Sequence, residues 1–207
     1  MSMQHNSPYI VIEGLDGAGG TTQCRLLQSW LEQRGCTVVL TNEPTNLPVG
    51  KFIRQVLQDP DSLIGDAVLS YLFGADRQNH LDTRVFPALD RGEIVISDRY
   101  YHSSLAYQSL SLDFDFVAKI NGQFPAPSIT FFLMLEPEIS FERVQLRGLP
   151  VERFETLDRL RSIAQSYERV IQYCTEQGEN IVCIDATQTI DEIHDTICQH
   201  VEPMLTQ

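Results

Sequence analysis

A glycine-rich segment near the N-terminus has residue types and spacing suited to holding a phosphate. It reads Gly14-Leu15-Asp16-Gly17-Ala18-Gly19-Gly20-Thr21-Thr22 and follows the apolar run 9–12. Glycines let the backbone curl so that successive N–H groups point at one anion, and a following helix adds partial positive charge at its N-terminus. We therefore predict that the phosphates of a nucleotide such as ATP are bound by Gly14, Asp16, Gly17, Ala18, Gly19, Gly20, Thr21 and Thr22.

The segment departs from the phosphate-binding template at one position. Gly14, Gly19 and Thr21 match G-x-x-x-x-G-K-[ST], but Gly20 stands where the template has lysine. That lysine normally reaches the β- and γ-phosphates, so one positive charge is missing, whereas Thr21 can still offer its hydroxyl to Mg²⁺. Taken alone, the segment is also compatible with a glycine-rich strand-to-helix turn that binds nothing.

A carboxylate and a guanidinium follow another apolar run, 94–96. Asp98 can hold Mg²⁺ directly or through water, and the planar guanidinium of Arg99 can donate two hydrogen bonds to one phosphate. The alternative is a structural ion pair at the end of a strand. We predict Thr21 and Asp98 as the Mg²⁺ ligands.

Two pairs of side chains have the spacing of neighbours on a helix. Arg77 follows Phe73 by four positions, so both lie on one face, which suits a base held between an aromatic ring and a guanidinium. A buried phenylalanine beside a solvated arginine is the alternative. Asp76 lies on an adjoining face and is assigned to the surface. Ser104 and Tyr107 are three positions apart and form the second pair.

These residues require a scaffold, which the apolar pattern supplies. Short apolar runs alternate with longer amphipathic stretches, including 21–33, 49–58 and 63–90, and the pattern predicts an α/β fold with an all-parallel, five-stranded sheet and helices on both faces. Ligands of such sheets bind beyond the carboxyl ends of the strands. The expected strands are 9–12, 37–40, 94–96, 129–135 and 181–184.

Composition narrows the class of protein. The 207 residues, 43% of them hydrophobic, predict one domain over 1–207, with 1–7 flexible. A net charge of −13 argues against nucleic acid or an acidic membrane as a partner. No run of about eighteen apolar residues and no signal-peptide pattern occur. Five scattered cysteines predict reduced thiols in a cytoplasmic protein.

In five segments, placed in family order between residue 8 and about 187, the chain resembles the thymidylate kinase family. They are the glycine-rich loop, Glu43-Pro44, Leu72-Phe73-Gly74-Ala75-Asp76-Arg77, the stretch from Ser97-Asp98-Arg99-Tyr100 to Ala106-Tyr107-Gln108, and Glu152-Arg153-Phe154-Glu155. The resemblance implies a P-loop kinase with a short LID at about 147–155. It also implies transfer of the γ-phosphate of ATP to dTMP, giving dTDP and ADP, with Mg²⁺ as cofactor and a homodimer as the assembly.

The resemblance assigns roles around the transferred phosphate. It implies that Arg99 binds the monophosphate of the acceptor and lies near the transferred group. Asp16 resembles the carboxylate that holds the sugar 3′-hydroxyl or a Mg²⁺-bound water. Glu43 is placed near the acceptor phosphate, where it could orient Arg99 or a metal-bound water. Glu13 is expected to be a buried partner at the strand end.

The resemblance also assigns the base and sugar contacts. Phe73 and Arg77 would hold the base, with a hydrogen bond from Arg77 to a thymine carbonyl. Ser104 and Tyr107 would touch the base and the sugar, and a tyrosine ring against C2′ would exclude a ribose hydroxyl. Some relatives carry asparagine in place of Ser104. Gln108 is either a base or sugar contact or a surface glutamine.

Positive charge at the transition state has to come from outside the loop, because residues 15–18 contain no basic side chain. The family resemblance then points to arginines of the LID, and Arg147 and Arg153 are predicted as catalytic together with Arg99 and Asp16. Arg143 shares a helical face with Arg147 by its spacing. One LID arginine or Arg25 could reach the β/γ position in place of the lysine. A face of solvated arginines is the alternative.

Two other functions remain open at this point. One is a kinase of a different deoxynucleotide, or of a deoxynucleoside, on the same scaffold. The other is a catalytically weak nucleotide-binding protein that has lost transfer together with the lysine at position 20.

Overall fold

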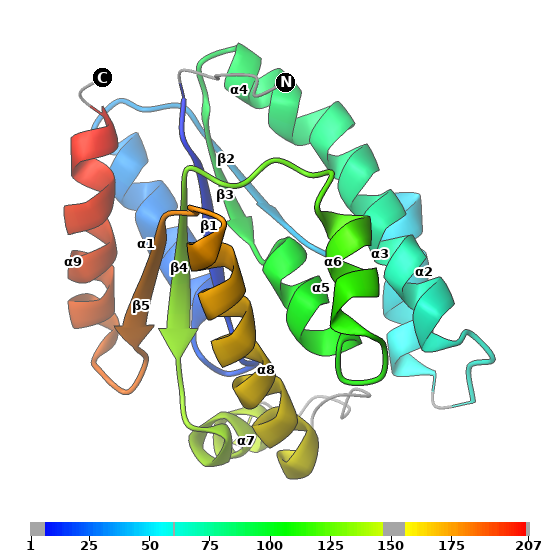
Figure 1. Ribbon diagram of the computed structural model, residues 1–207. Coiled ribbons are helices and arrows are strands. Elements are labelled where there is room, and N and C mark those ends of the chain that lie inside the picture. The colour runs from blue at the N-terminus through cyan, green and yellow to red at the C-terminus, as the bar shows by residue number, and fades with distance from the viewer. Residues whose placement is uncertain (1–6, 60, 147–155, 206–207) are drawn as a thin grey trace.

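A five-stranded parallel sheet forms the centre of the molecule in the computed structural model (Figure 1), which describes residues 7–59, 61–146 and 156–205. The strand order is β2-β3-β1-β4-β5. The predicted α/β class with an all-parallel sheet is confirmed. The strands are β1 (Tyr9–Gly14), β2 (Val38–Asn42), β3 (Ile94–Asp98), β4 (Ile129–Met134) and β5 (Ile181–Asp185).

Helices cover both faces of this sheet. Figure 1 shows α1 and α9 together on one face, with α5 and α8 on the other. The helices are α1 (Gly20–Glu32), α2 (Pro48–Gln58), α3 (Asp66–His80), α4 (Phe86–Asp90), α5 (Tyr101–Gln108), α6 (Phe114–Asn121), α7 (Pro137–Leu146), α8 (Leu157–Glu176) and α9 (Ile190–Val201), with the short turns η1 (Leu81–Val85) and η2 (Glu202–Leu205).

The alternation of side chains along β1 divides the core into two layers. Tyr9 and Val11 pack with α5 and α8, whereas Ile10 and Ile12 pack with α1 and α9. Successive residues of a strand point to opposite faces, so a strand buried on both sides is apolar throughout. This explains why the first apolar run is continuous rather than alternating.

The predicted helical stretch 63–90 is divided into three segments. α3 is followed by the π-helical turn η1 and then by α4, which has Pro87 in its first turn. Proline has no N–H to donate, so it suits the first turn of a helix and is unfavourable further inside one. Among the described residues, no helix is both long and apolar enough to cross a membrane.

Candidate functional site

The glycine-rich loop joins β1 to α1 at the carboxyl edge of the sheet. A side chain at Gly14 would place its Cβ 2.8 Å from the carbonyl oxygen of Leu133, so only glycine fits against β4 there. Gly19 has a φ of 98°, in the left-handed region that glycine tolerates, and directly precedes α1. The loop therefore has the tight turn and the helix N-terminus that the sequence predicted.

The sheet places Asp98 beside this loop. Asp98 is paired with Ile12 of β1, and its Oδ2 accepts a hydrogen bond of 2.5 Å from Thr21 Oγ1. A Cβ added at Gly20 would lie 3.2 Å from Asp98 Oδ1. A hydroxyl and a carboxylate, both oxygen donors of the kind Mg²⁺ prefers, thus meet at the start of α1.

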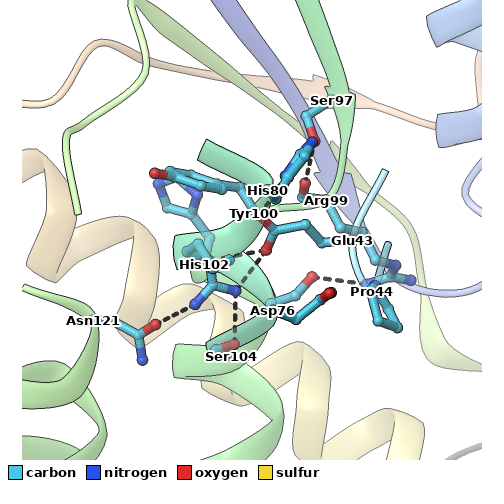
Figure 2. A network of polar contacts seen from close by, with 12 residues as sticks. Glu43, Pro44, Asp76, His80, Ser97, Arg99, Tyr100, His102, Ser104 and Asn121 are labelled. Atoms are coloured by element: carbon cyan, nitrogen blue, oxygen red, sulfur yellow. Dashed lines mark hydrogen bonds and ion pairs between the residues drawn. The ribbon is translucent and has the colours of Figure 1, made fainter. Parts of the chain in front are cut away.

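Arg99 is held in an unusual backbone conformation. Its φ is 73°, the one positive value among the described non-glycine residues. Its N–H donates to the carbonyl of Ile12 at 3.0 Å, and its own carbonyl accepts from Ser97 Oγ at 2.7 Å (Figure 2). Left-handed backbone costs an arginine about 1–3 kcal/mol and tends to occur at functional sites. These two bonds fix the direction in which the side chain leaves the strand.

The guanidinium of Arg99 reaches across to the loop. Nη2 donates to Asp16 Oδ1 at 2.7 Å, and Nη1 donates to Ser103 Oγ at 3.0 Å and to the hydroxyl of Tyr167 at 3.2 Å. Asp16 Oδ2 accepts from the hydroxyl of Tyr107 at 3.3 Å. The side chains of Arg99 and Asp16 are 21% and 29% exposed, so both remain open to a ligand.

Glu13 lies beneath this group and is buried at the strand end, as predicted. Its carboxylate accepts from the backbone N–H of Tyr100 at 2.8 Å, from the hydroxyl of Ser103 at 2.6 Å and from that of Tyr167 at 3.1 Å. It therefore anchors the first turn of α5 and, through Ser103, the guanidinium of Arg99.

Arg77 is the centre of a buried polar network, and Figure 2 labels its partners Glu43, Ser104 and Asn121. Its Nε donates to Glu43 Oε2 at 2.9 Å, Nη2 donates to Ser104 Oγ at 3.0 Å, and Nη1 donates to Asn121 Oδ1. Only 1% of Arg77 is exposed, although it lines the cavity described below, so its contact with a base stays a prediction. Its partner Asn121 belongs to α6, so the spacing of residues within α3 could not indicate this contact.

Glu43 and Asp76 also differ from their predicted surroundings. Glu43 pairs with Arg77 at 2.8 Å and with His80 Nδ1 at 3.0 Å, whereas the Arg99 that it was expected to orient is paired with Asp16. Asp76, assigned to the surface, is 1% exposed and accepts from Thr45 N–H at 2.7 Å and Thr45 Oγ1 at 2.6 Å. A carboxylate is buried here because the loop after β2 supplies those donors.

Gln108, at the end of α5, carries an acceptor with no partner. The residue is buried, and its Oε1 has no hydrogen bond to any part of the chain that the structure describes. It lines the same cavity as Phe73, Ser104 and Tyr107. A buried carbonyl oxygen without a donor is costly, so this atom is suited to receiving an N–H group from a ligand.

One cavity of about 610 Å³ brings these parts together. The loop forms one wall and the α3–α5 side chains form another. Every predicted site residue within the described ranges lines it: Gly14, Asp16, Gly17, Ala18, Gly19, Gly20, Thr21, Thr22, Glu43, Phe73, Arg77, Asp98, Arg99, Ser104, Tyr107 and Gln108.

Comparison with known proteins agrees with this arrangement. The thymidylate kinase family model matches residues 12–197. The chain belongs to the thymidylate kinase family. It is 36% identical to a probable thymidylate kinase of Pyrococcus horikoshii, over 91% of this chain and 93% of the relative. It is 35% identical to the thymidylate kinase of Halothermothrix orenii, over 95% and 97% of the two chains.

Some residues in this thymidylate kinase fold were not singled out from the sequence. Asn121 and His80 carry no motif, and their contacts with Arg77 and Glu43 depend on how α3 and α6 pack. Arg143, whose spacing predicts a helical face shared with Arg147, donates to the carbonyls of Gly17 at 3.2 Å and Ala186 at 3.3 Å, at the rim of the loop. The predicted catalytic residues Arg147 and Arg153, and the LID at 147–155, lie outside the described residues.

Proposed function

We propose that this protein transfers the γ-phosphate of ATP to dTMP, giving dTDP and ADP, as a step of dTTP synthesis. The observation that carries the proposal is the single cavity in which the phosphate loop faces Arg99 and the α3–α5 wall. Phosphoryl transfer depends mainly on positioning and on positive charge around the transferred group. A shared cavity allows both nucleotides to approach the same point, and the reduced cysteines are consistent with a cytoplasmic enzyme.

The donor half would bind ATP with Mg²⁺. Loop N–H groups and the N-terminus of α1 suit the triphosphate, and Thr21 Oγ1 and Asp98 Oδ2 form an oxygen donor pair that fits the metal. When bound, Mg²⁺ supplies charge that neutralises the phosphate oxygens. In place of the missing lysine we propose either Arg25, which lines the cavity, or one of the predicted LID arginines, Arg147 or Arg153.

The acceptor half would bind the monophosphate through Arg99 and the sugar through Asp16 and Tyr107. Arg99 is already directed at the loop by Ser103 and Tyr167, so binding requires little reorganisation. Protein covers Arg77, so we propose that the ring of Phe73, which lines the cavity, stacks on the base. The residual contact of Arg77 with the cavity suits a hydrogen bond from its edge to a thymine carbonyl.

Gln108→Leu is expected to raise KM for dTMP about tenfold, which corresponds to the loss of one neutral hydrogen bond to the substrate. The physical reason is that Gln108 Oε1 would accept the N3–H of thymine. KM is measured by coupled ADP release. Gln172→Leu, at an exposed position of α8, is the matched control and should leave KM unchanged. An unchanged KM in the Gln108 variant would show that this amide does not contact the acceptor.

Acceptor identity is tested by ADP release with dTMP, dUMP, dCMP, ribothymidine 5′-monophosphate and thymidine. We expect the highest kcat/KM with dTMP, a lower value with the ribo analogue because Tyr107 crowds C2′, and no turnover of thymidine, which lacks a phosphate for Arg99. Preference for thymidine would make the protein a deoxynucleoside kinase. No turnover with any acceptor, alongside measurable dTMP binding, would leave a nucleotide-binding protein.

We also propose a homodimer formed through α2 and α3. These adjoining helices expose Phe52, Val68 and Tyr71, which are 43%, 49% and 58% exposed. Large apolar side chains gathered on neighbouring helices are typical of an interaction surface. The mass in solution should therefore be twice the 23.5 kDa of one chain.

Tyr71→Arg is expected to shift the protein to the monomer mass, because a charge would be buried in the dimer interface without a partner. Light scattering coupled to size-exclusion chromatography measures this shift. Ile190→Arg changes a similarly exposed apolar residue on α9 and should leave the mass unaltered. A dimer that persists in the Tyr71 variant would place the interface elsewhere.

A further inference from the structure

A second group of potential metal ligands lies away from the phosphate loop. His102 comes from α5, Cys174 from the last turns of α8, and Glu179 from the turn before β5. One ligand atom from each side chain lies within 4.8 Å of the other two. His102 and Cys174 are fully buried, and the Glu179 side chain is 10% exposed. Three separate elements therefore deliver a nitrogen, a sulfur and an oxygen donor to one point.

We propose that His102, Cys174 and Glu179 bind a divalent cation of the zinc class. Zinc in proteins takes imidazole nitrogen, thiolate sulfur and carboxylate oxygen in tetrahedral sites, whereas Mg²⁺ and Ca²⁺ favour oxygen alone. The mixed donor set therefore selects against the Mg²⁺ that Thr21 and Asp98 would hold. The partly exposed side of Glu179 leaves a route for the ion and room for a fourth ligand.

The surroundings of His102 support a cation at its Nε2 atom. Nε2 lies 2.9 Å from Glu179 Oε2. Nδ1 is buried without a hydrogen-bond partner among the residues that the structure describes, and it lies 3.8 Å from Glu13 Oε1. A metal on Nε2 requires the ring proton to sit on Nδ1, where it faces the carboxylate of Glu13. Metal-bound histidines commonly have a carboxylate at their other N–H. Glu13 is a carboxylate near Nδ1, although 3.8 Å exceeds hydrogen-bond distance.

The thiol gives the binding step a defined proton balance. Burial raises the pKa of Cys174, so the thiol keeps its proton in the metal-free protein. Burial alone would raise the pKa of Glu179, but hydrogen bonds from His102, Tyr101 and Cys174 lower it, so the carboxylate is charged. The cation forms a sulfur–metal bond as the S–H bond breaks. The thiol proton leaves to solvent.

The site would join the end of α8 to α5 and the sheet. It is also connected to the cavity that contains the phosphate loop, because Glu13, which faces His102, accepts from Ser103, and Ser103 accepts from Arg99. Because a bound ion would join these elements, it would stabilise the folded protein, and it would do so without touching either nucleotide.

Cobalt titration of the full chain, stripped beforehand with a chelator, tests the proposal. Co²⁺ is the probe because a thiolate bound to it gives a charge-transfer absorption band. We expect one equivalent to produce the band, Zn²⁺ to abolish it, one proton to be released per ion, and thermal unfolding to shift upward. Cys198→Ser is the matched control, since Cys198 lies 3.4 Å from His194 Nε2 in a comparable cysteine–histidine pair.

Cys174→Ser should remove the band, and Glu179→Gln should weaken Co²⁺ binding about 100-fold while leaving the thiol in place. The Glu179 variant keeps the test valid if the serine variant fails to fold. The proposal is overturned if wild-type protein shows no thiolate band, if the band survives in the Glu179 variant at unchanged affinity, or if it is lost in Cys198→Ser. Any of these results would mean that the three side chains form a hydrogen-bonded cluster only.

Discussion

Arg99→Ala lowers kcat/KM for dTMP phosphorylation by about 10³-fold, the effect expected when one arginine is removed from a phosphoryl-transfer site. Arg99 is the predicted ligand of the acceptor phosphate. Its guanidinium also contacts the phosphate loop, through Asp16 at 2.7 Å. Its loss removes the group placed between acceptor and donor. Steady-state ADP release with ATP and dTMP measures the change.

Two further variants separate charge from structure. Arg91→Ala removes an exposed arginine that pairs with Glu93 just before β3, at the opposite end of the strand from Arg99, and should leave kcat/KM unchanged. Arg99→Lys keeps the charge but loses the planar fork, so its kcat/KM should lie between wild type and Arg99→Ala. Equal activity in wild type and Arg99→Ala, with both proteins folded, would contradict the assignment.

Arg77→Met lowers the free energy of unfolding by about 3–5 kcal/mol, because it leaves the buried carboxylate of Glu43 without its main partner. The two side chains are 1% and 3% exposed, so water cannot take the place of the guanidinium. The loss should lower Tm by roughly 10 °C for a chain of this size. Denaturant unfolding measures the free energy, and ADP release should also show a raised KM for dTMP.

The double variant Arg77→Met/Glu43→Gln identifies the cause. If the unpaired charge is responsible, the double variant is less destabilised than the sum of the two single variants. Additive losses, or a loss below about 1 kcal/mol in Arg77→Met, would show that the ion pair does not organise this part of the fold.

The sequence was sufficient for the sheet and for the residues at its carboxyl edge, and insufficient for what packs against them. Continuous apolar runs locate β1, β3 and β4, and the parallel order then forces Asp98 next to the loop. The burial of Arg77 could not be foreseen in the same way. Its partner Asn121 is 44 positions along the chain and depends on the docking of α6 against α3.

Asp76 shows the same limitation. Helical periodicity placed it on an adjoining face, but its burial follows from the loop after β2, which turns the N–H and hydroxyl of Thr45 toward it. A periodic pattern reports which side chains share a face. It does not report whether a loop from elsewhere covers that face with hydrogen-bond donors.

Gly20 occupies the position of the template lysine, so it is the residue at which to test whether the site transfers phosphate without that lysine. The described structure shows little free space there, since a Cβ would meet Asp98 Oδ1 at 3.2 Å and Ile12 Cγ2 at 3.8 Å. Asp98 is in turn bonded to Thr21. Positive charge is available from Arg25 on the cavity wall and from the arginines of the LID.

The most direct test compares kcat of the wild-type protein with that of Gly20→Lys, at saturating ATP, Mg²⁺ and dTMP. If arginines already supply the missing charge, wild type turns over dTMP and the lysine variant changes kcat by less than about tenfold. If wild type binds dTMP without turnover and Gly20→Lys gains several orders of magnitude in rate, the protein is a binding protein that has lost catalysis with its lysine.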